Sequence, residues 1–317
     1  MRIAIIDCMN HDIGLKILFP EAHYYICASE IDKSKSYDKY NFKPILLENY
    51  ASVTSSKYDV IFIVVALYDT LTTTKFYKPQ VKSIYDKIKN EILDKNNFEK
   101  VVLFDNYDYD YDPSERADTD KIDLYMKRNY NVNKKYNPKV HSFPFIMFGE
   151  YSIIEKLEDP YFNRDNRYNG IFFAGSLFYH DDPQYNIKRD RRIIYDIQEY
   201  VSVYPMVSYT EYMTNMRRYK YALDLVGVGD PNKRTFEILG SGALRVAQRT
   251  DLKWPFEDKF EEDTLFSTPE EFFEKIDMLN KNPDIFHKCL DKQEEIVKKY
   301  FNKKWIREYI ILTLELV

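Results

Sequence analysis

A regular alternation between strand-sized apolar runs and amphipathic stretches constrains the fold of this chain most strongly. In the first half, apolar runs stand at residues 2–7, 22–29, 43–48, 59–67 and 100–106. Continuous runs of this kind are typical of parallel strands that are covered on both faces. Residues 78–95 lie between two of these runs and carry apolar side chains at helical spacing, which predicts a crossover helix. The pattern therefore predicts an α/β fold with a parallel sheet.

The second half repeats this scheme, which predicts a second sheet. Strands are expected at 168–176, 202–207, 221–227 and 243–248, and helices at 190–201, 209–220, 233–242, 268–282 and 287–316. The join between the two halves is expected within residues 148–168, where the polar stretch that starts at residue 158 has no periodicity. Chains of 317 residues tend to divide into two domains. We therefore expect an N-terminal domain over 1–155 and a C-terminal domain over 156–317.

Composition limits the compartment and the partners. The longest apolar run, residues 60–68, is too short to span a membrane, and the N-terminus lacks the pattern of a secretory signal. Cys8, Cys27 and Cys289 are too few and too scattered for a disulfide framework or a zinc site. A soluble, cytoplasmic protein is expected. The net charge of −5 gives no sign of the basic stripe of duplex-binding proteins, so no nucleic-acid partner is expected.

Glycines mark a candidate ligand site in the second half. Six of the eight glycines lie between residues 170 and 242, and Gly175, Gly227 and Gly229 follow the carboxyl ends of expected strands. Ligands bind outside these ends in open α/β sheets. Glycine also allows the backbone to approach a ligand closely. These positions therefore predict a binding site at the carboxyl edge of the second sheet.

A basic pair at the start of the helix expected over 233–242 indicates what this site binds. Lys233 and Arg234 lie in or beside its first turn, where free N–H groups attract phosphate. The Arg234 guanidinium can donate two parallel hydrogen bonds to a diphosphate. Glu237 lies three residues further on and is suited to accept hydrogen bonds from ribose hydroxyls. A surface ion pair and a simple helix C-cap at 240–242 are the structural alternatives.

Residues 219–248 and 262–279 resemble the C-terminal nucleotide-sugar domain of GT-B glycosyltransferases. The resemblance is closest to the glycosyl-transferase group 1 (family 4-like) and spore-protein-like branch. It implies two Rossmann-like domains facing a cleft, with the C-terminal helix packing back on the first domain. It also implies a UDP- or GDP-sugar donor, a hydroxyl acceptor on a glycan or glycoconjugate, and no required metal or other cofactor.

The same resemblance assigns roles to the residues of the site. Arg234 and Lys233 would hold the diphosphate and Glu237 the ribose, whereas Gly175 and Ser176 would lie under the donor. Many retaining members of the family carry a second glutamate, eight positions before the one that corresponds to Glu237. Here Gly229 occupies that position and Asp230 stands beside it. Either Asp230 contacts the donor sugar or that contact is lost, which leaves the sugar and the stereochemistry open.

A loop after the first expected strand carries the candidate catalytic residues. His11 and Asp12 lie in this loop, and histidine is suited to proton abstraction near neutral pH. The acceptor-side loops of GT-B enzymes occupy this point in the chain. The alternative is an ordinary solvated loop.

Three other functions compete with this hypothesis. Asp108, Asp110 and Asp112 form an Asp-x-Asp pattern, with which metal-dependent GT-A glycosyltransferases hold a divalent ion. GT-A enzymes would not account for residues 221–248, so we rank this alternative second. A non-catalytic nucleotide-sugar-binding protein and a glycosyltransferase acting on DNA bases are the others. Turnover of donor would exclude the first of these two, and salt-dependent duplex binding would support the second.

Overall fold

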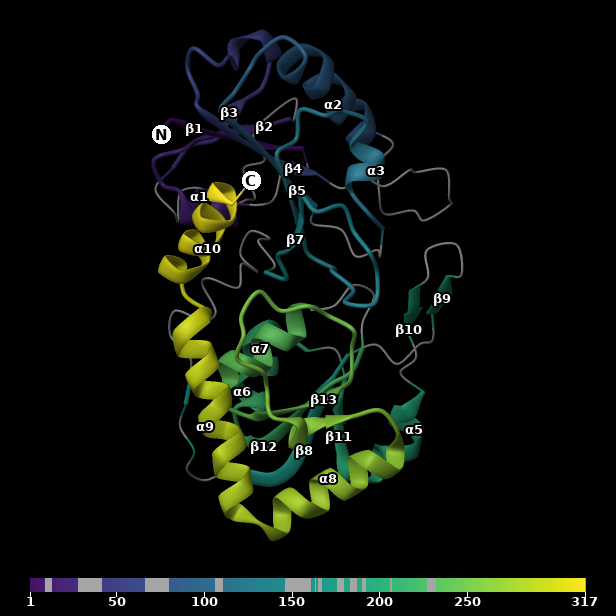
Figure 1. The fold of residues 1–317 in the computed structure, drawn as a ribbon. Coiled ribbons are helices and arrows are strands. Elements are labelled where there is room, and N and C mark those ends of the chain that lie inside the picture. The colour runs from purple at the N-terminus through teal and green to yellow at the C-terminus, as the bar shows by residue number, and fades with distance from the viewer. Residues whose placement is uncertain are drawn as a thin grey trace. The chain divides into compact units, whose positions relative to one another are not determined.

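The chain forms two compact units, Met1–Ser152 together with Ile306–Val317, and Ile153–Trp305 (Figure 1). The computed structural model describes residues 1–8, 13–27, 42–65, 80–105, 111–145, 161–162, 164, 167–175, 180–182, 187–189, 192–205, 207–226 and 232–316. Among these residues, no helix combines the length and the apolar character that crossing a membrane requires.

The first unit is built on a seven-stranded sheet in which every neighbouring pair is parallel. The strand order is β3-β2-β1-β4-β5-β6-β7. The strands are β1 (Ile3–Asp7), β2 (His23–Ile26), β3 (Ile45–Leu46), β4 (Val60–Val65), β5 (Lys100–Asp105), β6 (Leu124–Lys127) and β7 (Val140–Ser142). This order is that of a doubly wound fold, in which the chain changes direction between β1 and β4.

The first five strands lie where apolar runs predicted them, but β6 and β7 were not predicted. The sequence of β6 contains a lysine, Lys127, which favours a surface position. In the fold Lys127 is fully buried, because its Nζ pairs with Asp105 at 3.0 Å and lies over the Tyr111 ring. Tyr111 also donates a hydrogen bond to Asp105 at 2.7 Å. Lys127 and the adjacent Arg128 are therefore both buried.

The last helix of the chain packs on the first unit, as the resemblance implied. Helix α10 (Lys303–Glu315) buries Ile306 and Ile310 there. Arg307 donates to the Leu18 carbonyl at 2.8 Å and forms an ion pair with Glu21. The long terminal helix is broken, since α9 (Pro283–Tyr300) ends before α10 begins. The other helical segments of this unit are α1 (Gly14–Leu18), η2 (Tyr50–Ser52), α2 (Gln80–Ile88), the π-helical turn η3 (Lys89–Leu93) and α3 (Ser114–Ala117).

The second unit contains a five-stranded parallel sheet with the order β11-β8-β12-β13-β14. Its strands are β8 (Tyr168–Ala174), β11 (Val201–Tyr204), β12 (Tyr219–Asp224), β13 (Leu244–Gln248) and β14 (Leu265–Phe266). Counted within this unit, the order is 2-1-3-4-5. The chain therefore changes direction between β8 and β12, and ligands of open α/β sheets bind at the carboxyl ends of such a strand pair.

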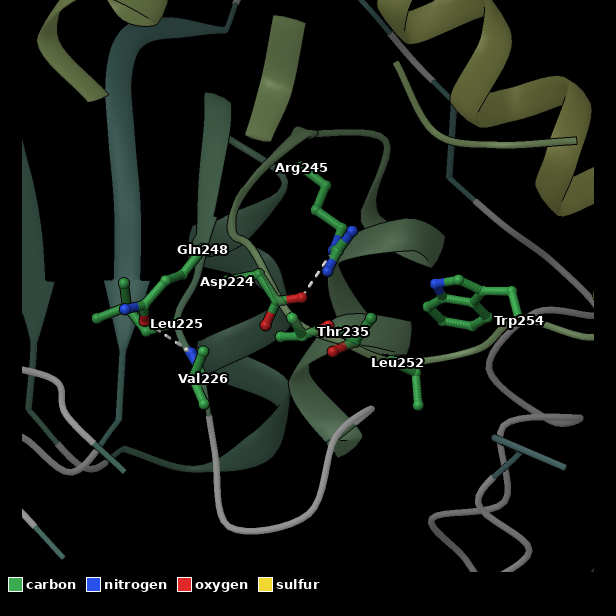
Figure 2. A pocket seen from close by; sticks show the side chains of 9 residues that line it. Asp224, Leu225, Val226, Thr235, Arg245, Gln248, Leu252 and Trp254 are labelled. Carbon is green, nitrogen blue, oxygen red and sulfur yellow. Dashed lines mark hydrogen bonds and ion pairs between the residues drawn. The ribbon is translucent and has the colours of Figure 1, made fainter. Parts of the chain in front are cut away.

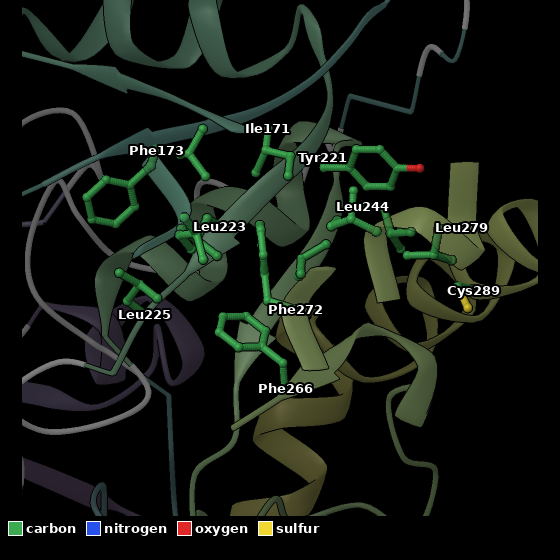
Figure 3. Close-up of a cluster of buried hydrophobic side chains, with 14 of the residues drawn as sticks. Ile171, Phe173, Tyr221, Leu223, Leu225, Leu244, Phe266, Phe272, Leu279 and Cys289 are labelled. Carbon is green, nitrogen blue, oxygen red and sulfur yellow. The ribbon is translucent and has the colours of Figure 1, made fainter. Parts of the chain in front are cut away.

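Helices cover both faces of the second sheet. One face packs Ile171, Phe173, Leu223 and their neighbours against α5 (Ile193–Ile197), α8 (Pro269–Lys281) and α9 (Figure 3). The other face packs Phe172 and Ala222 against α6 (Tyr209–Met216) and α7 (Lys233–Ser241). The alternation of residues 171–173 between the faces is the period of a strand buried on both sides. Short segments complete the unit: the antiparallel pair β9 (His180–Asp182) and β10 (Ile187–Arg189), η6 (Gln198–Tyr200) and η7 (Glu262–Thr264).

The glycine pair at 240–242 has a structural role. Gly242 ends α7 with a φ of +74°, a conformation that side-chain-bearing residues rarely adopt. A Cβ at this position would lie 2.1 Å from the Tyr161 carbonyl oxygen. Helix termination and this close approach both require glycine, so the C-cap alternative holds at residue 242.

Candidate functional site

The structure describes four of the predicted site residues, which are Gly175, Lys233, Arg234 and Glu237. The other six lie outside the described residues: His11, Asp12, Ser176, Gly227, Gly229 and Asp230. The site can therefore be built from the first turn of α7 and the carboxyl edge of the second sheet.

Helix α7 begins at a defined cap. The Asn232 side chain accepts a hydrogen bond from the Arg234 N–H at 2.9 Å, and asparagine is a preferred N-cap residue. Buried Phe236, Ile238 and Leu239 hold the helix against the rest of the unit. The N-terminus of α7, with its positive partial charge, is thus fixed in place.

Arg234 carries the most informative feature of the site. Its Nη1 is buried and has no hydrogen-bond partner among the described residues. Its guanidinium lies over the ring of Phe173, 4.8 Å from the ring centroid. Phe173 is the second-to-last residue of β8. Gly175 follows two residues later and forms an exposed bend. Arg234 and the glycine turn after β8 are therefore brought to the same edge, and the guanidinium there can receive an acceptor from a ligand.

Glu237 and Lys233 form the neighbouring part of the site. Lys233 Nζ lies 3.5 Å from Glu237 Oε1, and the Glu237 side chain is buried. Lys233 also lies over the Tyr209 ring, 5.0 Å from its centroid. This ion pair joins two residues that are four positions apart on α7.

Two tyrosines of α6 belong to this site and were not singled out in the sequence. Burial raises the pKa of the Tyr212 hydroxyl well above its ordinary value, and the adjacent Glu237 carboxylate raises it further. Tyr209 presents its partly exposed ring to Lys233. A sequence signal for this arrangement exists. Ser208 caps the start of α6, and the spacing of three residues between the tyrosines places both rings on one face of the helix.

A small pocket opens at the carboxyl ends of β12 and β13, beside the first turn of α7 (Figure 2). In its wall, Arg245 Nε pairs with Asp224 at 2.7 Å, and Gln248 accepts a hydrogen bond from the Val226 N–H at 3.2 Å. The lining is mixed and combines polar side chains with four apolar ones. The lining residues are Asp224, Leu225, Val226, Thr235, Arg245, Gln248, Thr250, Leu252 and Trp254.

The Asp-x-Asp pattern has one described member, and this residue has a structural role. Asp112 is 5% exposed. It accepts hydrogen bonds from the Ser114 N–H at 2.8 Å and from the Asn137 N–H at 2.7 Å. Asp108 and Asp110 lie outside the described residues. Within the described part of the chain, no group of three or more histidine, cysteine or acidic side chains is placed to hold a metal ion.

Comparison with solved structures shows which class of fold this is. The chain is similar over its whole length to HepE from Anabaena in complex with UDP, with 10% identity, full coverage of both chains and a TM-score of 0.55. It is also similar to the DNA-modifying enzyme β-glucosyltransferase, with 12% identity, coverage of 99% and 100% and a TM-score of 0.52. T4 phage BGT with UDP and Mn²⁺ matches at 12% identity, coverage of 99% and 100% and a TM-score of 0.49. The fold is that of GT-B proteins, as the sequence predicted.

A family comparison adds a match over most of the second unit. Residues 178–310 match the glycosyl transferase-like family. The match covers less than half of the chain, whereas the GT-B fold extends over all of it. The GT-A alternative does not agree with this architecture. The spore-protein-like branch stays a prediction, and no curated protein sequence matches the chain.

Proposed function

We propose that the protein transfers a sugar from a UDP-sugar to a hydroxyl group of a glycan or glycoconjugate. The buried Nη1 of Arg234, which has no acceptor among the described residues, is the observation that carries this proposal. A buried donor left unsatisfied costs about 1–3 kcal/mol. A diphosphate oxygen at this position would supply the missing acceptor, and the N-terminus of α7 would add its N–H groups.

The leaving group is the centre of the proposed chemistry. Breaking the bond between the sugar and the diphosphate leaves negative charge on the phosphate oxygens. Arg234 and the first-turn N–H groups of α7 would stabilise this charge, with Lys233 nearby as a second cation. Groups that are fixed in advance around developing charge usually make the largest single contribution to enzymatic rate enhancement.

The other predicted residues complete the proposal. Glu237 would accept hydrogen bonds from the ribose, and Tyr212 would hold its carboxylate in place. Gly175, Ser176, Gly227 and Gly229 would leave room for the donor beneath the backbone. Asp230 would contact the donor sugar. On the acceptor side, His11 and Asp12 would orient the acceptor hydroxyl or take its proton.

UDP is favoured over GDP as the nucleotide, because HepE, which shares this fold, was solved with UDP bound. The test is a calorimetric titration of the full-length protein with UDP, GDP and dTDP, followed by assays of sugar release from the corresponding nucleotide sugars. Binding of UDP together with slow hydrolysis or transfer supports an enzyme. Binding without any turnover supports the non-catalytic alternative, and absence of binding by all three nucleotides contradicts the donor site.

The need for a metal and the identity of the acceptor are tested separately in the same assay. Transfer that persists in EDTA agrees with the expected charge stabilisation by Arg234 and α7, whereas activity restored only by Mn²⁺ would require a metal-assisted reaction. Oligosaccharides and duplex DNA should be offered in parallel. The net charge of −5 favours the oligosaccharide.

A further inference from the structure

Two cysteines that are distant in the sequence meet at the carboxyl edge of the first sheet. Strands β1 and β2 pair in parallel, with Asp7 opposite Ile26, so Cys8 and Cys27 are the next residues in register. The Cys27 N–H donates to the Asp7 carbonyl at 3.3 Å, which continues the pairing up to the cysteines. Adjacent strands lie about 4.8 Å apart. This spacing falls within the range of about 4.4–6.8 Å that disulfides span between Cα atoms.

The two side chains are also in contact. The hydrogen bond between the two thiols, together with burial, holds the pKa of the Cys8 thiol well above its ordinary value. Both cysteines carry free thiols in the structure. Cys8 is buried, whereas Cys27 is only partly buried. The pair therefore combines a partly exposed cysteine with a buried partner.

We propose that Cys8 and Cys27 form a reversible dithiol–disulfide site, with small-molecule disulfides such as oxidised glutathione as the oxidant. The Cys27 thiolate attacks one sulfur of oxidised glutathione and releases one glutathione thiolate, which leaves a mixed disulfide. The Cys8 thiol then loses its proton and attacks the Cys27 sulfur, which releases the second glutathione. Two protein thiols are oxidised to one disulfide, and one molecule of oxidised glutathione is reduced to two thiols.

A disulfide between Cys8 and Cys27 would affect the neighbouring part of the chain. Cys8 directly follows β1, and the strand order of the first sheet changes direction between β1 and β4. The chain continues from Cys8 directly into residues 9–12, which contain the predicted His11 and Asp12. A disulfide would tie this point of the chain to the end of β2. The chemistry of the pair itself does not depend on the proposed transfer reaction.

The test uses the reduced full-length protein, oxidised glutathione as the probe, and mass spectrometry without reduction. The wild type should lose the mass of two hydrogen atoms, yield a peptide in which Cys8 is linked to Cys27, and recover both thiols with dithiothreitol. Cys27→Ser should lose this linked peptide. Cys289→Ala serves as the matched control, because Cys289 lies on α9 of the other unit, and it should form the linkage as the wild type does.

Two results would overturn the proposal. The first is a stable glutathione adduct on Cys27 while Cys8 remains free, since the second exchange step would then not occur. The second is full retention of all three thiols in the wild type under conditions that oxidise an exposed dithiol peptide. The peptide map of the wild type alone distinguishes these two results from the expected one. The test can therefore be decided even if a cysteine variant fails to fold.

Discussion

Arg234 has an environment that the fold alone does not explain. Its guanidinium lies over Phe173, and its Nη1 has no acceptor among the described residues. Arg234→Ala should weaken UDP binding by about 1.5–3 kcal/mol, the range for hydrogen bonds to charged groups. Isothermal titration calorimetry measures this change.

A matched arginine separates this effect from a general loss of charge. Arg249 lies in the same unit, is partly exposed and pairs with Glu262 at 2.5 Å. Arg249→Ala should bind UDP like the wild type. Equal affinity of wild type and Arg234→Ala for UDP would contradict the diphosphate assignment.

Glu237 should act on donor binding more than on the chemical step, because ribose hydroxyls are present before and during the reaction. Glu237→Ala should raise the donor KM with a smaller change in kcat, the pattern of uniform binding. Glu237→Gln should be milder, since its amide oxygen still accepts hydrogen bonds. Tyr212→Phe should raise the donor KM in the same direction, since it removes the hydroxyl next to this carboxylate. A fall in kcat at unchanged KM would argue against a ribose contact.

Asp59 provides a pH-dependent contribution to stability. The side-chain hydrogen bond from Arg2 is the largest cause that lowers the pKa of Asp59 to about 2. A carboxyl group with a depressed pKa stabilises the folded state above its ordinary pKa, and the stabilisation is lost as pH falls toward the folded-state pKa. Asp59→Asn should therefore lower the Tm at pH 7 more than at pH 3. Thermal unfolding at both pH values checks this, and an equal shift would contradict it.

At the scale of elements, the first turn of α7 should contribute both to the stability of the fold and to UDP binding. Asn232→Ala removes the cap on the Arg234 N–H and should cost about 1 kcal/mol of unfolding free energy. The same change should weaken UDP binding, because the capped turn presents the N–H groups. Chemical denaturation and calorimetry measure the two effects.

Helix α8 supplies the control for this prediction. Thr268 caps α8 by accepting a hydrogen bond from the Glu271 N–H at 3.2 Å, away from the site. Thr268→Ala should cost a similar free energy of unfolding and leave UDP binding unchanged. If both variants bind UDP equally well, α7 does not form the anion site.

At the scale of the whole molecule, the C-terminal helix is part of the first unit. Ile310 is fully buried there, and truncation of a buried isoleucine costs about 2–5 kcal/mol. Ile310→Ala should destabilise strands of the first sheet while protection of the second sheet changes little. Hydrogen exchange followed by peptide mass spectrometry resolves the two units. Leu312→Ala, at a position that is 59% exposed, should have little effect.

Strands and helices could be predicted where the residues that determine them lie within the segment itself. Buried strands such as β4 and β5 consist of unbroken apolar runs, and α8 carries its own cap and N-terminal proline. Strand β6 was missed, because its lysine is buried only through a partner 22 residues earlier. The basic first turn of α7 was also predicted, because Lys233 and Arg234 are adjacent in the sequence.

The amino-acid order was enough to establish two parallel α/β sheets and a helix N-terminus suited to an anion. It was not enough to show which side chains meet. The contact of Arg234 with Phe173 and the proximity of Tyr212 to Glu237 both join separate parts of the chain. The meeting of Cys8 and Cys27 likewise follows only from the register of β1 and β2. Local patterns encode secondary structure because neighbouring residues share one period, whereas such contacts depend on how distant segments pack.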